Sequence, residues 1–147
     1  MSLLLLDSGR VAEALVEART AVELGKGLVA LDGTNIDWQM LLEGCYAALG
    51  ATLAILGNRD EALAAQRAGL AIAQTLVAAD PSQVAMQTEL AERHEEIGKL
   101  LWSTDRAAAV TAYRAAIAVY QQLVIAQPTN PEWPPIVEEL THTIARK

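Results

Sequence analysis

Apolar residues return every three or four positions along most of the chain, which is the spacing of one face of an α-helix. Between residues 39 and 56, for example, Leu42, Leu49 and Leu53 follow this spacing. Gly57-Asn58 then ends the pattern, because both residues tolerate the left-handed conformation found after helix C-termini. The pattern predicts six antiparallel helices joined by short turns. They cover residues 10–31, 38–56, 59–79, 82–103, 105–126 and 131–146.

Polar residues and proline predict where the helices in the middle of the chain begin and end. Asn58 or Asp60 is the expected N-cap of the third helix, since their side chains accept hydrogen bonds from free backbone N–H groups. Asp80-Pro81 ends this helix, because proline disfavours a helical conformation in the residue before it. Ser82 is the expected N-cap of the fourth helix.

The chain repeats its own pattern. Residues 15–38, 63–86 and 110–133 align without a gap, at offsets of 48 and then 47 residues. Aligned positions hold an arginine, a small residue, or a bulky residue at the end of the stretch. These matches are Arg19, Arg67 and Arg114; Ala21, Gly69 and Ala116; and Trp38, Met86 and Trp133. The chain is therefore an internal repeat with two helices in each period.

The segments between these stretches also match. Leu42 aligns with Leu90, and Leu5 stands where Leu53 stands one period later. Because Gly9-Arg10 precedes the first long match, we expect the chain to begin in the tail of a first helix. This helix would end near Gly9-Arg10, and a turn would follow it. The chain also ends in a first helix without its partner. We therefore expect a piece of a longer protein, with Met1-Ser2-Leu3 derived from a vector.

Small residues recur within the predicted helices. Gly50 and Gly98 lie in mid-helix, where glycine costs about 1 kcal/mol relative to alanine. A cost that recurs with the repeat indicates a neighbouring helix that passes too close for a Cβ atom. The same argument applies to Ala21, Gly69 and Ala116. Helix pairs of this kind bury their apolar faces by stacking on one another as a solenoid.

Composition favours helices over strands, with 28 Ala and 21 Leu but only 4% aromatic residues among 147. The net charge of −7 disfavours binding to nucleic acid. A single cysteine excludes an internal disulfide and a cysteine-rich zinc site. No apolar run approaches a membrane span, and the N-terminus lacks the features of a signal peptide. We expect a cytoplasmic protein with no membrane partner.

No residue pattern indicates catalysis. His94-Glu95-Glu96 lacks the second histidine that metalloproteases place on the same helix face. Gly25-Lys26-Gly27 lies within a helical pattern instead of following a strand, so it does not match a phosphate loop. Cys45 has no histidine near it in sequence and is expected to be an inert thiol. We expect no enzyme activity and no catalytic, metal or cofactor site.

Two segments carry a family resemblance. Tyr46-Ala47-Ala48-Leu49-Gly50 and His94-Glu95-Glu96-Ile97-Gly98 are similar to the first helix of the tetratricopeptide repeat, in which an aromatic residue precedes Leu-Gly. Ala62, twelve residues after Gly50, matches the small residue of that family's second helix, and Tyr113 matches its aromatic residue. The period of about 48 residues exceeds the usual 34 or so. The chain therefore resembles a long-helix variant of the family.

The resemblance implies an architecture. Tetratricopeptide repeats form a right-handed α-α superhelix of antiparallel helix pairs. Residues 1–147 would then form one repeat domain. Its repeats would cover residues 1–37 in part, 38–85, 86–132 and 133–147 in part.

The resemblance also implies a function, because the first helix of each pair lines a concave groove that holds a partner peptide in this family. The chain would be a protein–protein interaction scaffold that binds a peptide or domain of another protein. The first helices place the following residues on this groove: Gly44, Ala47, Ala48, Ala51, Ile55, Glu92, Glu95, Glu96, Lys99, Trp102, Ser103, Glu139, His142, Thr143 and Arg146.

Several of these groove residues, and some residues outside the groove, also have a plainer interpretation. Trp102 either anchors a basic or amphipathic peptide or packs in the core against Leu5-like neighbours. The alanine-rich strip either binds a partner or closes on a flanking helix. The four acidic residues are expected to form a solvated helix face. The repeated arginines are expected to cover the seam between repeats, with a partner-binding ladder as the alternative. The acidic residues are Glu89, Glu92, Glu95 and Glu96.

Two other functions fit the repeat equally well. The chain can be a homo-oligomerisation module, in which exposed ends or the alanine strip pair symmetrically. It can also be a regulatory appendage of a larger multidomain enzyme.

Overall fold

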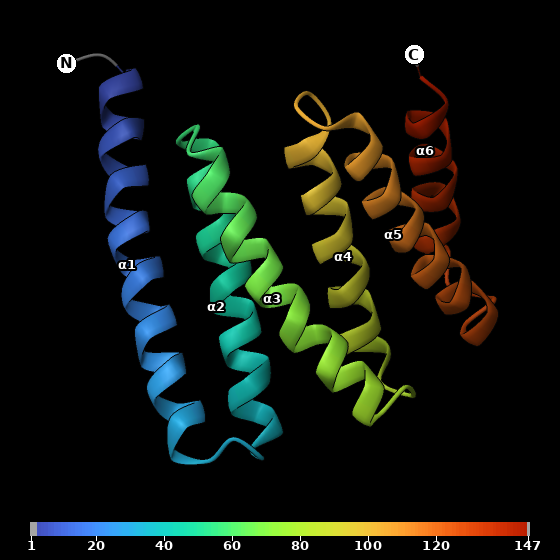
Figure 1. Ribbon diagram of the computed structural model, residues 1–147, viewed down its shortest axis with the longest axis horizontal. Coiled ribbons are helices and arrows are strands. Elements are labelled where there is room, and N and C mark those ends of the chain that lie inside the picture. Colours follow the sequence, from blue (N-terminus) through green and yellow to red (C-terminus); the bar gives the residue numbers. More distant parts are fainter. Residues whose placement is uncertain (1–2, 147) are drawn as a thin grey trace. The chain divides into compact units, whose positions relative to one another are not determined.

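The computed structural model describes the backbone of residues 3–146 and the side chains of residues 9–146. Within this range the chain forms six α-helices and no strand, as predicted (Figure 1). Consecutive helices pack together, as α1 does with α2, α4 with α5 and α5 with α6. The helices are α1 (Leu3–Leu31), α2 (Ile36–Ile55), α3 (Arg59–Ala79), α4 (Val84–Leu101), α5 (Arg106–Ala126) and α6 (Trp133–Ala145).

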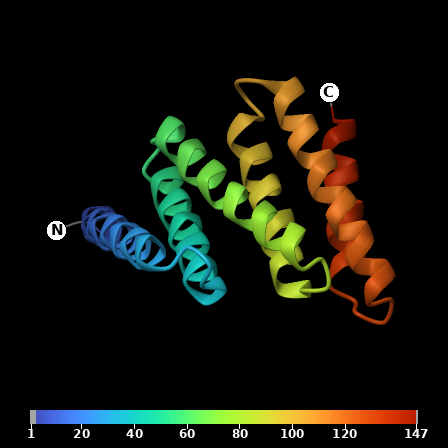
Figure 2. The ribbon, with the colours of Figure 1, turned by 60° about the horizontal axis from the view of Figure 1, so that its bottom comes forward.

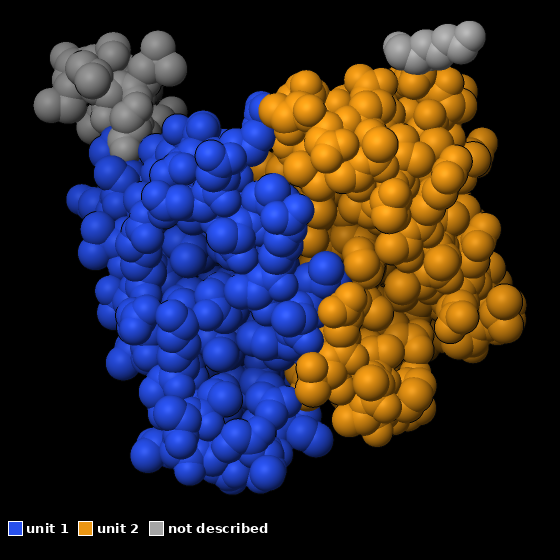
Figure 3. Space-filling view, in the orientation of Figure 1, with its two compact units in different colours: residues 1–72 blue, residues 73–147 orange. Residues whose placement is uncertain are grey.

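The chain divides into two compact units (Figure 3), and the division falls within α3, between Ile72 and Ala73. Unit 1 covers Met1–Ile72 and contains α1, α2 and the first part of α3. Unit 2 covers Ala73–Lys147 and contains the end of α3 with α4, α5 and α6. The single repeat domain expected for residues 1–147 stays a prediction.

Most helix ends lie where the sequence predicts them. Gly57 adopts a φ of 79° after α2, in the left-handed region that glycine tolerates. Helix α3 ends at Ala79, directly before Asp80-Pro81. The predicted N-cap at Ser82 is wrong: its hydroxyl donates to Asp80 Oδ1 at 2.6 Å, so it serves the turn instead of the helix. Gln83 is the N-cap of α4 and forms no side-chain cap bond.

The N-terminal helix differs from the prediction. Helix α1 runs without interruption from Leu3 to Leu31, so the expected turn near Gly9-Arg10 is wrong. Gly9 lacks the positive φ that Gly57 shows, and a single glycine costs a helix only about 1 kcal/mol. The proposed vector origin of Met1 and Ser2 falls outside the described residues, as does the side chain of Leu5.

The repeat recurs in the hydrogen bonds of the turns. The backbone N–H and hydroxyl of Thr34 both donate to Asp32 Oδ1, at 3.0 and 2.6 Å. One period later, the same two groups of Ser82 donate to Asp80 Oδ1, at 3.1 and 2.6 Å. The following helix reaches back in both cases, with Gln39 donating to the carbonyl of Gly33 and Gln87 to that of Pro81. The repeat therefore appears in the local structure as well as in the amino-acid sequence.

The recurring glycines lie where helices approach closely, as predicted. A Cβ atom on Gly50 of α2 would lie 2.5 Å from the amide nitrogen of Gln66 in α3. A Cβ atom on Gly98 of α4 would lie 2.9 Å from the ring of Tyr113 in α5. Gln66 and Tyr113 are aligned residues of the repeat, so the same contact is made once in each unit.

The core of unit 2 is built from the facing sides of α4, α5 and α6, which lie side by side in Figures 1 and 2. Partly buried Trp102, Val124, Val137 and other apolar residues pack around this core. Its buried members are Ala91, Tyr113, Ala116, Tyr120, Leu123, Trp133 and Leu140.

Among the described helices, α3 is long and apolar enough to cross a membrane by length and composition. The core helices of water-soluble proteins meet the same criteria, and fully buried Ala62 together with Gln66 places part of α3 in the interior. The absence of a membrane partner stays a prediction.

Candidate functional site

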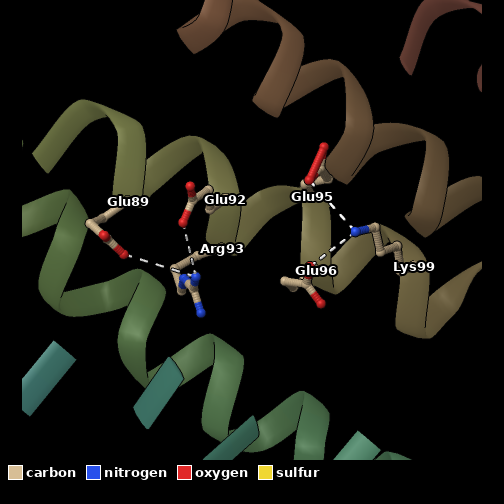
Figure 4. Close-up of polar contacts among 6 residues, drawn as sticks. All are labelled: Glu89, Glu92, Arg93, Glu95, Glu96 and Lys99. Atoms are coloured by element: carbon tan, nitrogen blue, oxygen red, sulfur yellow. Dashed lines mark hydrogen bonds and ion pairs between the residues drawn. The ribbon is translucent and has the colours of Figure 1, made fainter. Parts of the chain in front are cut away.

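Helix α4 carries charged residues along one side at spacings of three and four residues. Such spacings bring side chains together on a helix surface, so α4 builds two charge clusters from its own sequence. Figure 4 shows Glu89 and Glu92 directed towards Arg93, and Lys99 placed between Glu95 and Glu96.

Arg93 is the centre of the first cluster. Its side chain is only 8% exposed, and its Nη2 atom lies 3.5 Å from Glu92 Oε2 and 3.9 Å from Glu89 Oε2. A buried guanidinium needs such partners because charge is costly to remove from water. Arg93 thereby holds the carboxylates of Glu89 and Glu92 near its own guanidinium on the surface of α4.

Lys99 is the centre of the second cluster. Its Nζ atom donates to Glu96 Oε1 at 3.1 Å and lies 3.7 Å from Glu95 Oε2. Burial opposes the charge on Lys99, but the hydrogen bond to Glu96 and the charges of both glutamates raise its pKa. Lys99 therefore stays protonated and neutralises part of the cluster.

The carboxylates are more buried and more crowded than a solvated helix face would be. The side chain of Glu95 is 19% exposed, so the expectation of full solvation is wrong for this residue. Burial raises the pKa of Glu95, Lys99 opposes the rise, and the charges of Glu96 and Glu139 add to it. Glu139 belongs to α6, so the carboxylates of two helices repel one another here.

The pKa of Glu92 is raised for the same two reasons, burial and nearby carboxylates. Burial raises its pKa, the charges of Glu89, Glu95 and Glu96 raise it further, and Arg93 opposes them. We define the acidic face as the side of unit 2 that carries five carboxylates and two cations. Its members are Glu89, Glu92, Arg93, Glu95, Glu96 and Lys99 of α4 with Glu139 of α6.

Trp102 ends α4 and packs within unit 2. Its ring centroid lies 5.7 Å from that of Tyr113 in an edge-to-face arrangement. The guanidinium of Arg106 lies over the Trp102 ring at 3.7 Å, and Arg106 Nε donates to the Trp102 carbonyl. One face of the ring is therefore already occupied by a cation of the same chain. This arrangement agrees with the packing interpretation of Trp102.

The other predicted groove residues lie on α2 and α6. In unit 1, Ala48, Ala51 and Ile55 are exposed along α2, and Ala47 is half-buried. In unit 2, His142 and Arg146 are exposed on or just after α6. Within unit 2 the structure brings Glu92, Glu95, Glu96 and Lys99 together with Glu139. The α2 residues belong to the other unit.

Sequence reasoning missed two residues that hold this region. Arg93 is not among the residues that the sequence singles out, although its spacing of four from Glu89 is a signal for an ion pair. Arg106 has the same spacing from Trp102, over which it stacks. Cys45 itself is half-buried, and burial raises the pKa of its thiol, as suits the inert role expected for it.

The repeated arginines behave differently from one another. Arg19 of α1 pairs with Glu61 of α3 at 2.8 Å, across the seam expected for it. Arg67 and Arg114 are exposed at the aligned positions. Among the side chains of residues 9–146, no three histidine, cysteine or acidic residues come together in a way that could hold a metal ion.

Comparisons with known proteins found no matching family model, no matching curated protein and no matching solved structure.

Proposed function

We propose that the chain is a protein–protein interaction module and that the acidic face binds a basic segment of a partner protein. One observation carries this proposal: the carboxylates of α4 are crowded and partly buried, Glu139 of α6 adds its charge to theirs, and the face holds fewer cations than anions. Their mutual repulsion is relieved when lysine or arginine side chains of a partner lie between them.

Partial burial makes such contacts stronger than ordinary surface ion pairs. Exposed pairs contribute about 0–1 kcal/mol because water screens them and flexible side chains must be ordered. Glu92 and Glu95 have already lost part of their water, and their neighbours hold them in place. A basic helix or extended peptide would therefore meet carboxylates that are ordered in advance.

The finer architecture belongs to the same proposal. We infer a right-handed superhelix of the tetratricopeptide type from the residues that resemble this family. Its concave side would add Ala47, Ala48, Ala51 and Ile55 of α2 and His142 and Arg146 of α6 to the surface that a long partner contacts. Non-catalytic action, without metal or cofactor, and a cytoplasmic location belong to the proposal as well; they rest on the composition of the chain and on its residue patterns.

The test titrates the 147-residue chain against a fluorescent lysine- and arginine-rich helical peptide. The fluorescence anisotropy of the peptide measures binding. The double variant Glu92→Gln/Glu95→Gln is expected to weaken binding about tenfold or more, since two charge-assisted contacts are lost. Raising the ionic strength from about 0.05 to about 0.5 M is expected to weaken binding of the unaltered chain.

The matched control is Glu13→Gln/Glu17→Gln, which changes the net charge equally but alters exposed residues of α1. It is expected to keep the affinity within about twofold. If both double variants weaken binding equally, the peptide senses only the net charge of −7, and the acidic face is not its site.

A further inference from the structure

Helices α5 and α6 leave an open apolar groove between them. The groove has a volume of about 410 Å³. Val124 and Val137 form its floor where they pack on the core of unit 2, and Ile125 stands at its edge with 79% of its surface exposed. The lining residues are Gln121, Val124, Ile125, Pro134, Val137 and Glu138.

Unit 2 contains the same groove one period earlier, in a covered form. Val77 of α3 and Gln87 and Leu90 of α4 align with Val124, Pro134 and Val137. Helix α5 lines this earlier groove with Ala118, Val119 and Gln122, and the groove has a volume of about 140 Å³. The structure therefore shows what fills such a groove: the second helix of the following repeat.

Helix α1 is the repeat counterpart of α5. Leu24 aligns with Val119, and Glu23 and Gly27 align with Ala118 and Gln122. Leu24 is 67% exposed on α1. A large apolar side chain is thus exposed at the position that covers the groove in the other copy of the repeat.

We propose that the α5/α6 groove binds α1 of a second copy of this chain, with Leu24 of that copy in the place that Val119 holds over Val77 and Leu90. Each copy offers a groove at one site and Leu24 at another, so the contact is heterologous. A heterologous contact generates closed rings or open chains of molecules, not a symmetric pair.

The two participating surfaces favour this occupant over an unrelated helix. The internal contact already shows that this repeat's second helix has the shape that fits the groove, and α1 has that helix's sequence pattern. Each copy carries a net charge of −7, so repulsion between copies opposes association. Added salt should therefore strengthen self-association by screening this repulsion.

Sedimentation velocity of the 147-residue chain over a range of concentrations tests the proposal. The mass is expected to rise with concentration from the 15.7 kDa of one chain, and more steeply at high salt. Leu24→Asp and Ile125→Asp are each expected to lower the association constant about tenfold or more, because each places a charge in an apolar contact. Both side chains are exposed in the single chain, so the fold should persist, as circular dichroism can verify.

Val16→Asp is the matched control. Val16 is 65% exposed on the same helix, but its counterpart Thr111 does not line the earlier groove, so the substitution should leave association unchanged. A mixture of Leu24→Asp with Ile125→Asp should form a dimer and nothing larger, since one intact groove meets one intact Leu24. A chain that stays monomeric at high concentration and salt overturns the proposal. So does association that Leu24→Asp leaves intact or that the mixture fails to restore.

Discussion

At the scale of single residues, close helix contact separates Gly98 from other helical glycines. A Cβ atom there would lie 2.9 Å from two ring carbons of Tyr113, which real Cβ atoms almost never do. Gly44 of α2 is also in mid-helix, but a Cβ atom there would meet nothing within 4 Å. Replacing glycine by alanine should therefore change the free energy of unfolding in opposite directions at Gly98 and Gly44.

Gly98→Ala is expected to lower the free energy of unfolding by about 1–3 kcal/mol, since the buried ring must shift to admit the methyl group. Gly44→Ala is expected to raise it by about 0.5–1 kcal/mol, because alanine loses less backbone freedom in a helix. Urea denaturation of the two variants measures both changes. Equal gains at the two sites would show that α4 and α5 do not approach as closely as described.

At the scale of helices, patterns within one segment predicted the elements well. Both ends of helix α3 were predicted correctly, because the signals for them, Gly57-Asn58 and Asp80-Pro81, lie directly beside the helix in the sequence. The partners of a side chain on another helix were beyond prediction. The effect of Glu139 on Glu95 depends on where α6 lies relative to α4, and the loss of solvent at Glu95 depends on the tertiary structure around α4.

The continuity of α1 shows a second limit. Gly9-Arg10 stands one period before Gly57-Asn58, and the alignment predicted a helix end there as well. The outcome depends on backbone conformation, which is left-handed at Gly57 and not at Gly9. Two glycines at aligned positions of the repeat therefore need not both end a helix.

Crowding of carboxylates on α4 has a consequence for stability. The pKa of Glu95 is raised in the folded chain, so its ionised form opposes folding above that raised pKa. Glu95→Gln is expected to raise the melting temperature at pH 7. The gain should shrink as pH falls through the raised pKa and vanish below about 4.5, where the unfolded chain is protonated too.

Glu61 provides a control of opposite sign. Hydrogen bonds from Arg19 and Asn58 lower its pKa, so its ionised form stabilises the fold. Glu61→Gln should therefore lower the melting temperature at pH 7, and the loss should disappear as pH falls through the lowered pKa. Thermal denaturation at a series of pH values from 7 downwards compares both variants. A melting temperature that falls with Glu95→Gln at pH 7 would contradict the description of the acidic face.

At the scale of the whole molecule, the net charge of −7 acts on the two proposed interactions in opposite directions. It attracts a basic partner to the acidic face and repels a second copy from the α5/α6 groove. Salt should therefore weaken the first interaction and strengthen the second. The two interactions use different residues of unit 2, so variants at one site leave the other available for measurement.

The most direct test of the central claim is a nuclear magnetic resonance titration of the ¹⁵N-labelled chain with the basic peptide. We expect the largest shifts of backbone amide signals at Glu92 and Glu95 of α4 and at Glu139 of α6, and we expect added salt to reverse them. Largest shifts at Ala48 and Ala51 of α2, with α4 unaffected, would contradict the assignment of the binding site to the acidic face.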